Sequence, residues 1–158
     1  MINKVSKEKA NDLAFGDAEE QKVLPVLKDY FMRNNIQRNP DKMGKYDFYC
    51  DIDADTMETW ELKSRKYYST NPKIRAEGCI INTDKFQFNT YVLFNFLDGL
   101  YCYTVRDKEA LDFKRDGGYV RNRVGGCASN EVSYVPFTVL KLIHKWPSKC
   151  LIKLDDDV

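Results

Sequence analysis

The sequence predicts an α/β fold, because segments of helical and of strand-like periodicity alternate along its 158 residues. Between residues 17 and 33 an apolar side chain recurs every three to four positions, which is typical of an amphipathic helix. Two later pairs of short segments, residues 46–50 with 59–65 and residues 91–97 with 100–105, are rich in aromatic and β-branched residues. We therefore expect a mixed sheet flanked by helices, in a chain whose length fits a single domain.

Glycine and proline predict where the helices begin and end. Residues 6–15 are expected to form a short helix that ends at Gly16, which tolerates left-handed geometry. Pro25 is expected to kink the following helix, because its ring clashes with the carbonyl four residues earlier. Asp98-Gly99 predicts a tight hairpin turn with positive φ. A last helix is expected over residues 136–145, opened by its proline, and residues 34–44 and 114–130 are expected to be loops.

Composition narrows the class of protein. The 25 basic and 24 acidic residues give a net charge of +1, far from the strongly basic balance of a protein that coats nucleic acid. The five cysteines contain no CxxC pair and there is one histidine, so a structural zinc site lacks its usual ligand spacing. No signal peptide and no membrane-spanning stretch is found. We expect an intracellular protein of the cytoplasm or nucleus, with free thiols and no membrane partner.

The first pair of strands carries the residues that could perform chemistry. Glu61 and Lys63 lie two positions apart and therefore project from the same strand face. If the hairpin turn is centred on Ala54, Asp47 lies directly opposite Glu61, with Cβ atoms roughly 4.5–5.5 Å apart. Two carboxylates at this distance need a cation between them, either Lys63 or a divalent metal ion. Magnesium is held in proteins by one or two carboxylates together with water and substrate phosphate.

Asp47, followed after thirteen residues by Glu61 and Lys63 in an E-x-K arrangement, resembles the motif of the PD-(D/E)XK nuclease superfamily. The resemblance covers roughly residues 16–105, with Tyr46 where the family name has proline. It implies a restriction-endonuclease-like αβββαβ core and a catalytic set of Asp47, Glu61 and Lys63. The two acids would ligate Mg²⁺, for which Mn²⁺ could substitute. The lysine would position or activate the attacking water and stabilise the charged transition state.

The helix before the first strand often supplies a further acid in this family. Glu20 shares a helix face with Leu24 and Leu27, so it is expected to point toward the sheet as a third metal ligand, and Glu19 is a further candidate. The alternative is a capping box, in which Asp17 is the N-cap of a helix and Glu20 satisfies its backbone amide.

Further polar residues are candidates for binding the substrate. They are Arg65, Lys85, Gln87, Arg121 and Arg123. In the resembled family, polar residues of the element after the E-x-K strand often face the substrate, which favours Lys85 and Gln87. The two later arginines lie near Tyr119 in a glycine-rich loop, a combination suited to phosphate contact and base stacking. Ordinary surface placement and solvated loop charge are the alternatives.

The leading hypothesis is a Mg²⁺-dependent nuclease that hydrolyses phosphodiester bonds of DNA, with endonucleolytic action favoured. The small size resembles that of structure-specific enzymes such as Holliday-junction resolvases, which work as homodimers. The alternatives are a non-catalytic nucleic-acid-binding module with the same fold and a nuclease that acts on RNA. The acidic run of residues 51–55 does not form an EF-hand loop, because the glycine and the glutamate that such a loop needs are absent.

Overall fold

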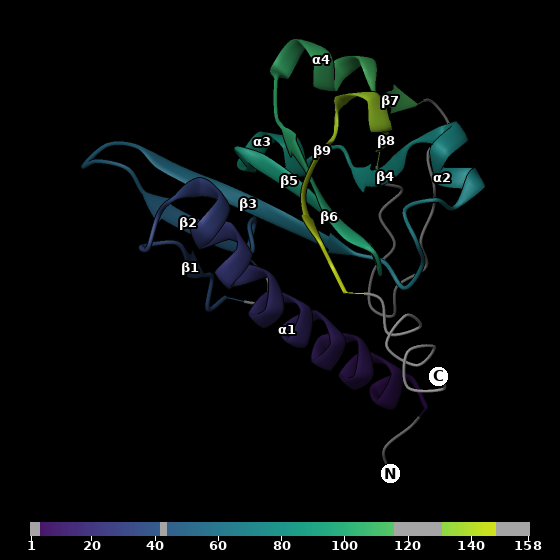
Figure 1. Cartoon of the computed structure of the whole chain (residues 1–158), viewed down its shortest axis with the longest axis horizontal. Coiled ribbons are helices and arrows are strands. Elements are labelled where there is room, and N and C mark those ends of the chain that lie inside the picture. Colours follow the sequence, from purple (N-terminus) through teal and green to yellow (C-terminus); the bar gives the residue numbers. More distant parts are fainter. Residues whose placement is uncertain (1–3, 42–43, 116–130, 148–158) are drawn as a thin grey trace, which may run out of the picture.

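The computed structural model describes residues 4–41, 44–115 and 131–147, with side chains from residue 10 onward. The strands form two sheets, one of six strands in the order β1-β2-β3-β5-β6-β9 and one of three in the order β4-β8-β7 (Figure 1). The elements in chain order are α1 (Lys4–Phe31), β1 (Gln37–Arg38), β2 (Phe48–Asp51), β3 (Met57–Ser64), α2 (Pro72–Glu77), β4 (Cys79–Asn82), α3 (Lys85–Phe88), β5 (Tyr91–Asn95), β6 (Gly99–Thr104), α4 (Asp107–Asp112), β7 (Lys114–Arg115), β8 (Val132–Val135), the 3-10 turn η1 (Phe137–Val139) and β9 (Lys141–Lys145). The α/β class and the mixed sheet are confirmed.

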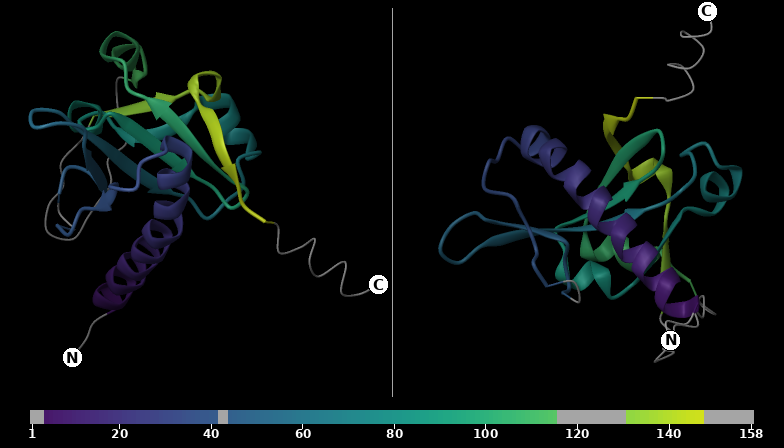
Figure 2. Two further views of the ribbon diagram at one scale, coloured as in Figure 1. Left: turned by 60° about the vertical axis from the view of Figure 1, so that its left-hand side comes forward. Right: turned by 90° about the horizontal axis from the view of Figure 1, so that it is seen from below.

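The six-stranded sheet is mixed because of one connection. β3 and β5 are parallel neighbours, whereas the other neighbouring strands of this sheet are antiparallel. Parallel neighbours require a crossover, which here contains α2, β4 and α3. α1 runs diagonally across one face of the sheet (Figures 1 and 2). The crossover elements contribute to the apolar core on the other face.

Two apolar cores lie on opposite sides of β3 and β5. On the α1 side, Val23 and Leu27 pack against a cluster that includes Trp60 of β3. On the other side, Val92 and Phe94 of β5 pack with side chains from α2, β4, α3, β6, α4 and β8. Burying a large apolar side chain contributes about 1.5–3 kcal/mol, so both clusters hold the sheet in place.

The alternation of side chains along β3 decides which residues share the second core. Glu61 and Lys63 are in register with Val92 and Phe94 of β5, and neighbouring side chains in register point to the same side of a sheet. Their even-numbered neighbours on β3 face α1 instead. The charged residues of the predicted motif therefore lie on the face away from α1.

α1 is continuous, so the predicted break at Gly16 is wrong. Glycine inside a helix costs about 1 kcal/mol relative to alanine, which is less than the burial of one large apolar side chain of α1 contributes. The helix also continues past Pro25 and ends at Phe31. Asp17 lies in the helix interior and is not an N-cap, so the capping-box explanation of Glu20 is wrong as well.

The segment after Pro136 is not a helix, and the prediction for residues 136–145 is wrong. The turn η1 follows Pro136 and leads into β9, which pairs antiparallel with β6. A short apolar run fits the periodicity of a helix and of a strand, and pairing with β6 also covers an otherwise open sheet edge. The predicted loop over residues 34–44 likewise contains the short strand β1.

The predicted hairpin of β5 and β6 is confirmed, but its turn is displaced by one residue. The amide of Phe96 donates to the carbonyl of Gly99 at 2.9 Å, so Leu97 and Asp98 form the tip. Neither Asp98 nor Gly99 has the positive φ expected of them. A Cβ at Gly99 would lie 2.9 Å from Cδ1 of Leu142 and 3.2 Å from the backbone carbonyl oxygen of His144, so a side chain at this position would be crowded by β9.

Candidate active site

The register of the β2–β3 hairpin is the one predicted from a turn centred on Ala54. Its ladder runs from the pair Phe48–Trp60 to the pair Asp51–Met57. Asp47 directly precedes this ladder, and its backbone amide donates to the carbonyl of Trp60 at 2.9 Å.

The carboxylate of Asp47 is fixed by the backbone of β3. Its Oδ2 accepts a hydrogen bond from the amide of Leu62 at 2.7 Å. A hydrogen bond between an amide and a charged acceptor is among the stronger ones in proteins. Because Leu62 is the residue between Glu61 and Lys63, this bond holds Asp47 beside both, as the sequence predicted.

Glu61 is the centre of a buried group of charges. Its side chain is 5% exposed, and its Oε1 lies 3.3 Å from Nζ of Lys63 and 3.5 Å from Nζ of Lys85. Lys63 follows on β3, whereas Lys85 comes from α3, at the end of the crossover. A buried carboxylate is costly unless it is paired, and here two ammonium groups share one oxygen. The predicted neighbourhood of Glu61 and Lys63 is confirmed, and Lys85 joins them.

The pKa values of Glu61 and Lys63 are shifted in opposite directions. Burial, reinforced by the negative charge of Asp47, raises the pKa of Glu61 from its ordinary 4.5 to about 7, and Lys63 and Lys85 oppose this shift. Burial lowers the pKa of Lys63. The positive charges of Lys85 and Arg65 lower it further, and the negative charge of Glu61 partly offsets this shift. The site therefore carries a carboxylate whose charge is under-compensated by the surrounding side chains, and a further cation nearby would favour its ionised form.

The other predicted substrate-binding residues lie in different surroundings. Arg65 follows β3 and its guanidinium donates to the backbone carbonyls of Ser64 at 3.5 Å and Ile80 at 3.3 Å. It is thus partly engaged in holding β4 to the end of β3. Gln87 is exposed on α3, two residues after Lys85. Arg121 and Arg123 lie outside the described residues. The predicted loop over 114–130 begins with the strand β7, which pairs with β8.

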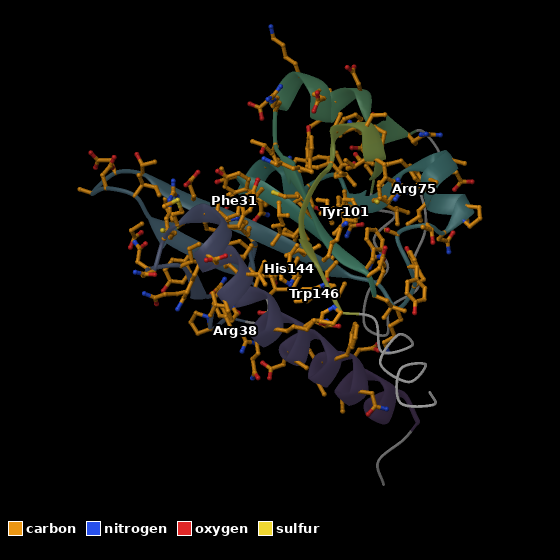
Figure 3. All side chains as sticks on the ribbon, viewed as in Figure 1. Phe31, Arg38, Arg75, Tyr101, His144 and Trp146 are labelled. Atoms are coloured by element: carbon orange, nitrogen blue, oxygen red, sulfur yellow. The ribbon has the colours of Figure 1, made fainter. Side chains whose placement is uncertain are left out.

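Glu20 points toward the sheet, as predicted, but it is not brought to Glu61. Its Oε1 lies 3.5 Å from Nε of Arg38 on β1, and Figure 3 shows Arg38 beside α1. Arg38 is paired in register with Phe48, a member of the apolar cluster that α1 covers. The Glu20–Arg38 pair therefore lies on the α1 face, whereas Glu61 lies on the opposite one. In the described part of the chain, no group of three or more His, Cys, Asp and Glu side chains could hold a metal ion.

Glu19, the other acid considered on α1, has partners on the same face as Glu20. Its Oε2 lies 3.3 Å from Nζ of Lys22 and accepts a hydrogen bond of 3.4 Å from Nδ2 of Asn95. The two acids of α1 therefore serve contacts with β1 and β5. The arrangement that remains for a metal ion is the carboxylate pair of Asp47 and Glu61.

Sequence reasoning missed two buried polar residues next to the site, Thr59 and Asn89. The side chain of Asn89 donates to the backbone carbonyls of Lys45 and Lys85, and the hydroxyl of Thr59 donates to that of Phe88. The only signal was a polar Asn-Thr pair directly before β5. Nothing in the periodicity distinguished that pair from an ordinary turn.

The cysteines within the described residues are free and buried, which agrees with the expected free thiols. They are Cys50, Cys79 and Cys102. Burial raises the pKa of Cys79 and of Cys102 to about 12. Because the reactive form of cysteine is the thiolate, these two thiols are poor nucleophiles and poor metal ligands.

Comparison of the chain with protein-family models, curated proteins and solved structures found no match. Within the described residues, no helix combines the length and the apolar character that crossing a membrane requires.

Proposed function

We propose that the protein is a Mg²⁺-dependent nuclease that hydrolyses phosphodiester bonds of DNA. The observation that carries the proposal is the pair of carboxylates of Asp47, directly before β2, and Glu61 on β3, next to the ammonium groups of Lys63 and Lys85. A divalent ion held by carboxylates can supply the nucleophile and stabilise the charge in phosphodiester hydrolysis, and the ammonium groups add positive charge beside it. The proposed core is restriction-endonuclease-like. The element order α1, β1, β2, β3, crossover helix and β5 parallel to β3 supports it.

The donor set fits a hard divalent cation. Asp47 and Glu61 offer only oxygen ligands, and Mg²⁺ is bound by one or two carboxylates plus water and phosphate oxygens. The charge of Asp47 contributes to raising the pKa of Glu61, so the two carboxylates repel each other and a cation between them would relieve this repulsion. When bound there, Mg²⁺ would supply a nucleophile from water and shield the charge on the phosphate. Mn²⁺ has similar ligand preferences and could substitute.

The surrounding side chains have separate roles in this proposal. Asp47 is oriented by the amide of Leu62, the residue that follows Glu61 on β3. Lys63 places a compact positive charge near the attacked phosphate, where it stabilises the charge that develops in the transition state. Lys85 adds a second positive charge on the same side of the sheet. Both lysines are partly exposed, at 23% of their side chains, so a phosphate can approach them from solvent.

Cleavage assays test the proposal directly. The purified protein would be incubated with linear, nicked, branched and single-stranded DNA, and with RNA, in Mg²⁺ and in EDTA. Cleavage in Mg²⁺ that is lost in EDTA and in Asp47→Asn is the expected result. Equal cleavage in EDTA, or full activity of Asp47→Asn, would refute the mechanism. Binding of nucleic acid without cleavage in any metal would instead support the non-catalytic module.

The resemblance to structure-specific nucleases adds two finer expectations. We propose endonucleolytic cleavage and a homodimer, because a branched substrate presents two strands for cleavage. Closed circular DNA distinguishes endonucleolytic from exonucleolytic action, since it has no ends. Sedimentation of the protein alone and with a four-way junction measures the oligomeric state. Cleavage of RNA in preference to every DNA substrate would assign the activity to the alternative class.

A further inference from the structure

The position of Lys85 depends on a very short helix. α3 has four residues, and a single helical turn has little stability of its own. Yet Nζ of Lys85 lies 3.5 Å from Glu61. The position of α3 must therefore be set by contacts outside its own backbone. Phe86 packs into the apolar core, and two buried polar side chains tie α3 to the segments around it.

Asn89, directly after α3, joins the two segments that bring side chains to Glu61. Its Nδ2 donates to the carbonyl of Lys85 at 2.9 Å and to the carbonyl of Lys45 at 3.1 Å. Lys85 carries the second ammonium group of the site, and Lys45 lies two residues before Asp47. A single amide, 7% exposed, thus links α3 to the segment that leads into β2.

The orientation of this amide is determined by its partners. Both partners of Asn89 are carbonyl oxygens, which accept hydrogen bonds, so the NH₂ end must face them. Its Oδ1 is buried and accepts no hydrogen bond from any described residue. A buried amide oxygen without a partner reduces stability, so stability alone does not account for an asparagine at this position.

Thr59 holds the other side of α3. It lies on β3 two residues before Glu61, and its Oγ1 donates to the carbonyl of Phe88, the last residue of α3, at 2.7 Å. Its backbone amide donates to Oγ1 of Thr90 at 3.0 Å. The C-terminal end of α3 is therefore tied to the strand that carries Glu61.

We propose that Asn89 is a positioning residue of the candidate active site, an inference that rests on the proposed nuclease function. By joining the carbonyls of Lys45 and Lys85, it keeps the Asp47 segment and α3 at a fixed separation around Glu61. Asn89 touches no reacting atom in this proposal. Its removal leaves the charges of the site in place but lets their relative positions vary, which lowers the rate of the chemical step.

Asn95 provides a matched control. It is also a buried asparagine, 2% exposed, but it lies on the α1 face of β5. There its Nδ2 donates to Oγ of Ser64 at 3.1 Å, and its Oδ1 accepts from the indole of Trp146 at 2.7 Å. Asn89→Ala and Asn95→Ala both remove a buried amide, and only the first removes a link within the site.

The experiment compares single-turnover cleavage at saturating protein, DNA affinity in Ca²⁺ and thermal unfolding for the two variants. Both are expected to lose stability. Asn89→Ala should cleave about tenfold or more slowly, because displacement of catalytic groups by an ångström is costly, with affinity nearly unchanged. Asn95→Ala should keep the wild-type rate below its unfolding temperature. Equal rate losses in the two variants, or no loss in either, would overturn the positioning role.

Two further variants separate the possible outcomes. In a Lys85→Ala background, Asn89→Ala should reduce the cleavage rate less than in the wild type, because the side chain that Asn89 positions through α3 is already absent. Fully additive losses of rate would contradict an effect of Asn89 through Lys85. If Asn89→Ala does not fold, Thr59→Val removes the separate hydrogen bond that ties the end of α3 to β3. It tests whether the position of α3 controls the rate, and it should slow cleavage. A wild-type rate for Thr59→Val would then count against the proposal.

Asp47→Asn in the same assay distinguishes failure of the nuclease mechanism from failure of the positioning role of Asn89. If Asp47→Asn cleaves like the wild type, the nuclease mechanism itself is wrong. If Asp47→Asn is inactive while Asn89→Ala behaves like Asn95→Ala, only the positioning role is wrong.

Discussion

The two faces of β3 are buried to a similar degree but have opposite chemistry. Trp60 faces α1, is fully buried, and contacts the rings of Phe31 and Tyr91 at centroid distances of 5.3 Å each. The next residue, Glu61, faces away from α1 and contacts Lys63 and Lys85. Burial of the first side chain stabilises the fold through the hydrophobic effect, whereas burial of the second removes a charge from water.

The difference indicates which of the two faces of β3 has side chains that stability explains. The residues in register with Glu61 and Lys63 on β5 are Val92 and Phe94, so apolar side chains on β3 would continue an apolar surface. Replacing buried ion pairs with apolar groups of similar volume is often neutral or stabilising. The charged residues of β3 are therefore not explained by stability, which supports a chemical role for them.

The largest expected effect is a difference in the free energy of unfolding between variants of Trp60 and of Glu61. Trp60→Ala should lower the free energy of unfolding by about 3–5 kcal/mol, because a large cavity remains in the core. Glu61→Gln should raise it at pH 8, because a buried charge is replaced by a neutral group of the same shape. Urea denaturation in EDTA measures both. A loss in Glu61→Gln as large as that in Trp60→Ala would show that the ion pairs hold the fold.

The pH dependence of stability sharpens the same comparison. The pKa of Glu61 is raised from 4.5 to about 7 in the folded protein, so the folded state holds this proton more tightly than the unfolded state. The resulting stabilisation is fully present below about pH 4.5 and is lost as the pH rises through 7. At about 1.4 kcal/mol for each pKa unit, the loss is on the order of 3 kcal/mol.

Glu61→Gln is the control for this pH dependence, since it keeps the other titrating groups. Denaturation of both proteins at pH values from 4.5 to 8.5 in EDTA should show their difference in stability growing with pH. Parallel pH profiles would mean that Glu61 is ionised throughout this range and that its lysine partners compensate its burial fully.

Local pairings were predictable from the sequence, whereas contacts made across the fold were not. The register between Asp47 and Glu61 followed from a turn of a few residues and from strict side-chain alternation. Glu20 was predicted to join Glu61 but pairs with Arg38. That partner could not be foreseen, because Arg38 belongs to a strand of two residues that has no periodicity of its own. Which face α1 covers is decided by the packing of the whole sheet.

β9 and Lys85 illustrate the same limit. The run before Trp146 fits a helix and a strand equally well, and pairing with β6 decided the outcome. Lys85 was selected for its place after the E-x-K strand, but its contact with Glu61 depends on the crossover and on Asn89. No local pattern encodes the contact between Glu61 and Lys85, because the crossover that connects them must fold before they can meet.

Within the site face, Lys63 should affect the chemical step more than binding. Its ammonium group is held 3.3 Å from Glu61, where it can act on the developing charge of the transition state. Lys63→Ala should slow single-turnover cleavage by about a hundredfold with little change in DNA affinity measured in Ca²⁺. Lys108→Ala, which alters an exposed lysine of α4, should change neither. Weaker affinity with normal cleavage at saturating protein would make Lys63 a phosphate anchor.

The smallest expected effect is that of Arg121 and Arg123, whose charges should contribute to DNA affinity without a fixed position in the active site. Arg121 and Arg123 belong to a glycine-rich segment outside the described residues, and we expect them to bind phosphates without entering the chemistry. Removing one arginine–phosphate interaction should lower the salt slope of binding by about one and weaken all sequences alike. The double variant Arg121→Ala, Arg123→Ala should therefore bind DNA with a slope lower by about two and cleave normally once saturated. Titrations at several salt concentrations measure the slope, with Lys63→Ala as the opposite case. An unchanged slope would leave the two arginines as solvated surface charge, and slower cleavage at saturation would place them with the chemistry of the β3 face.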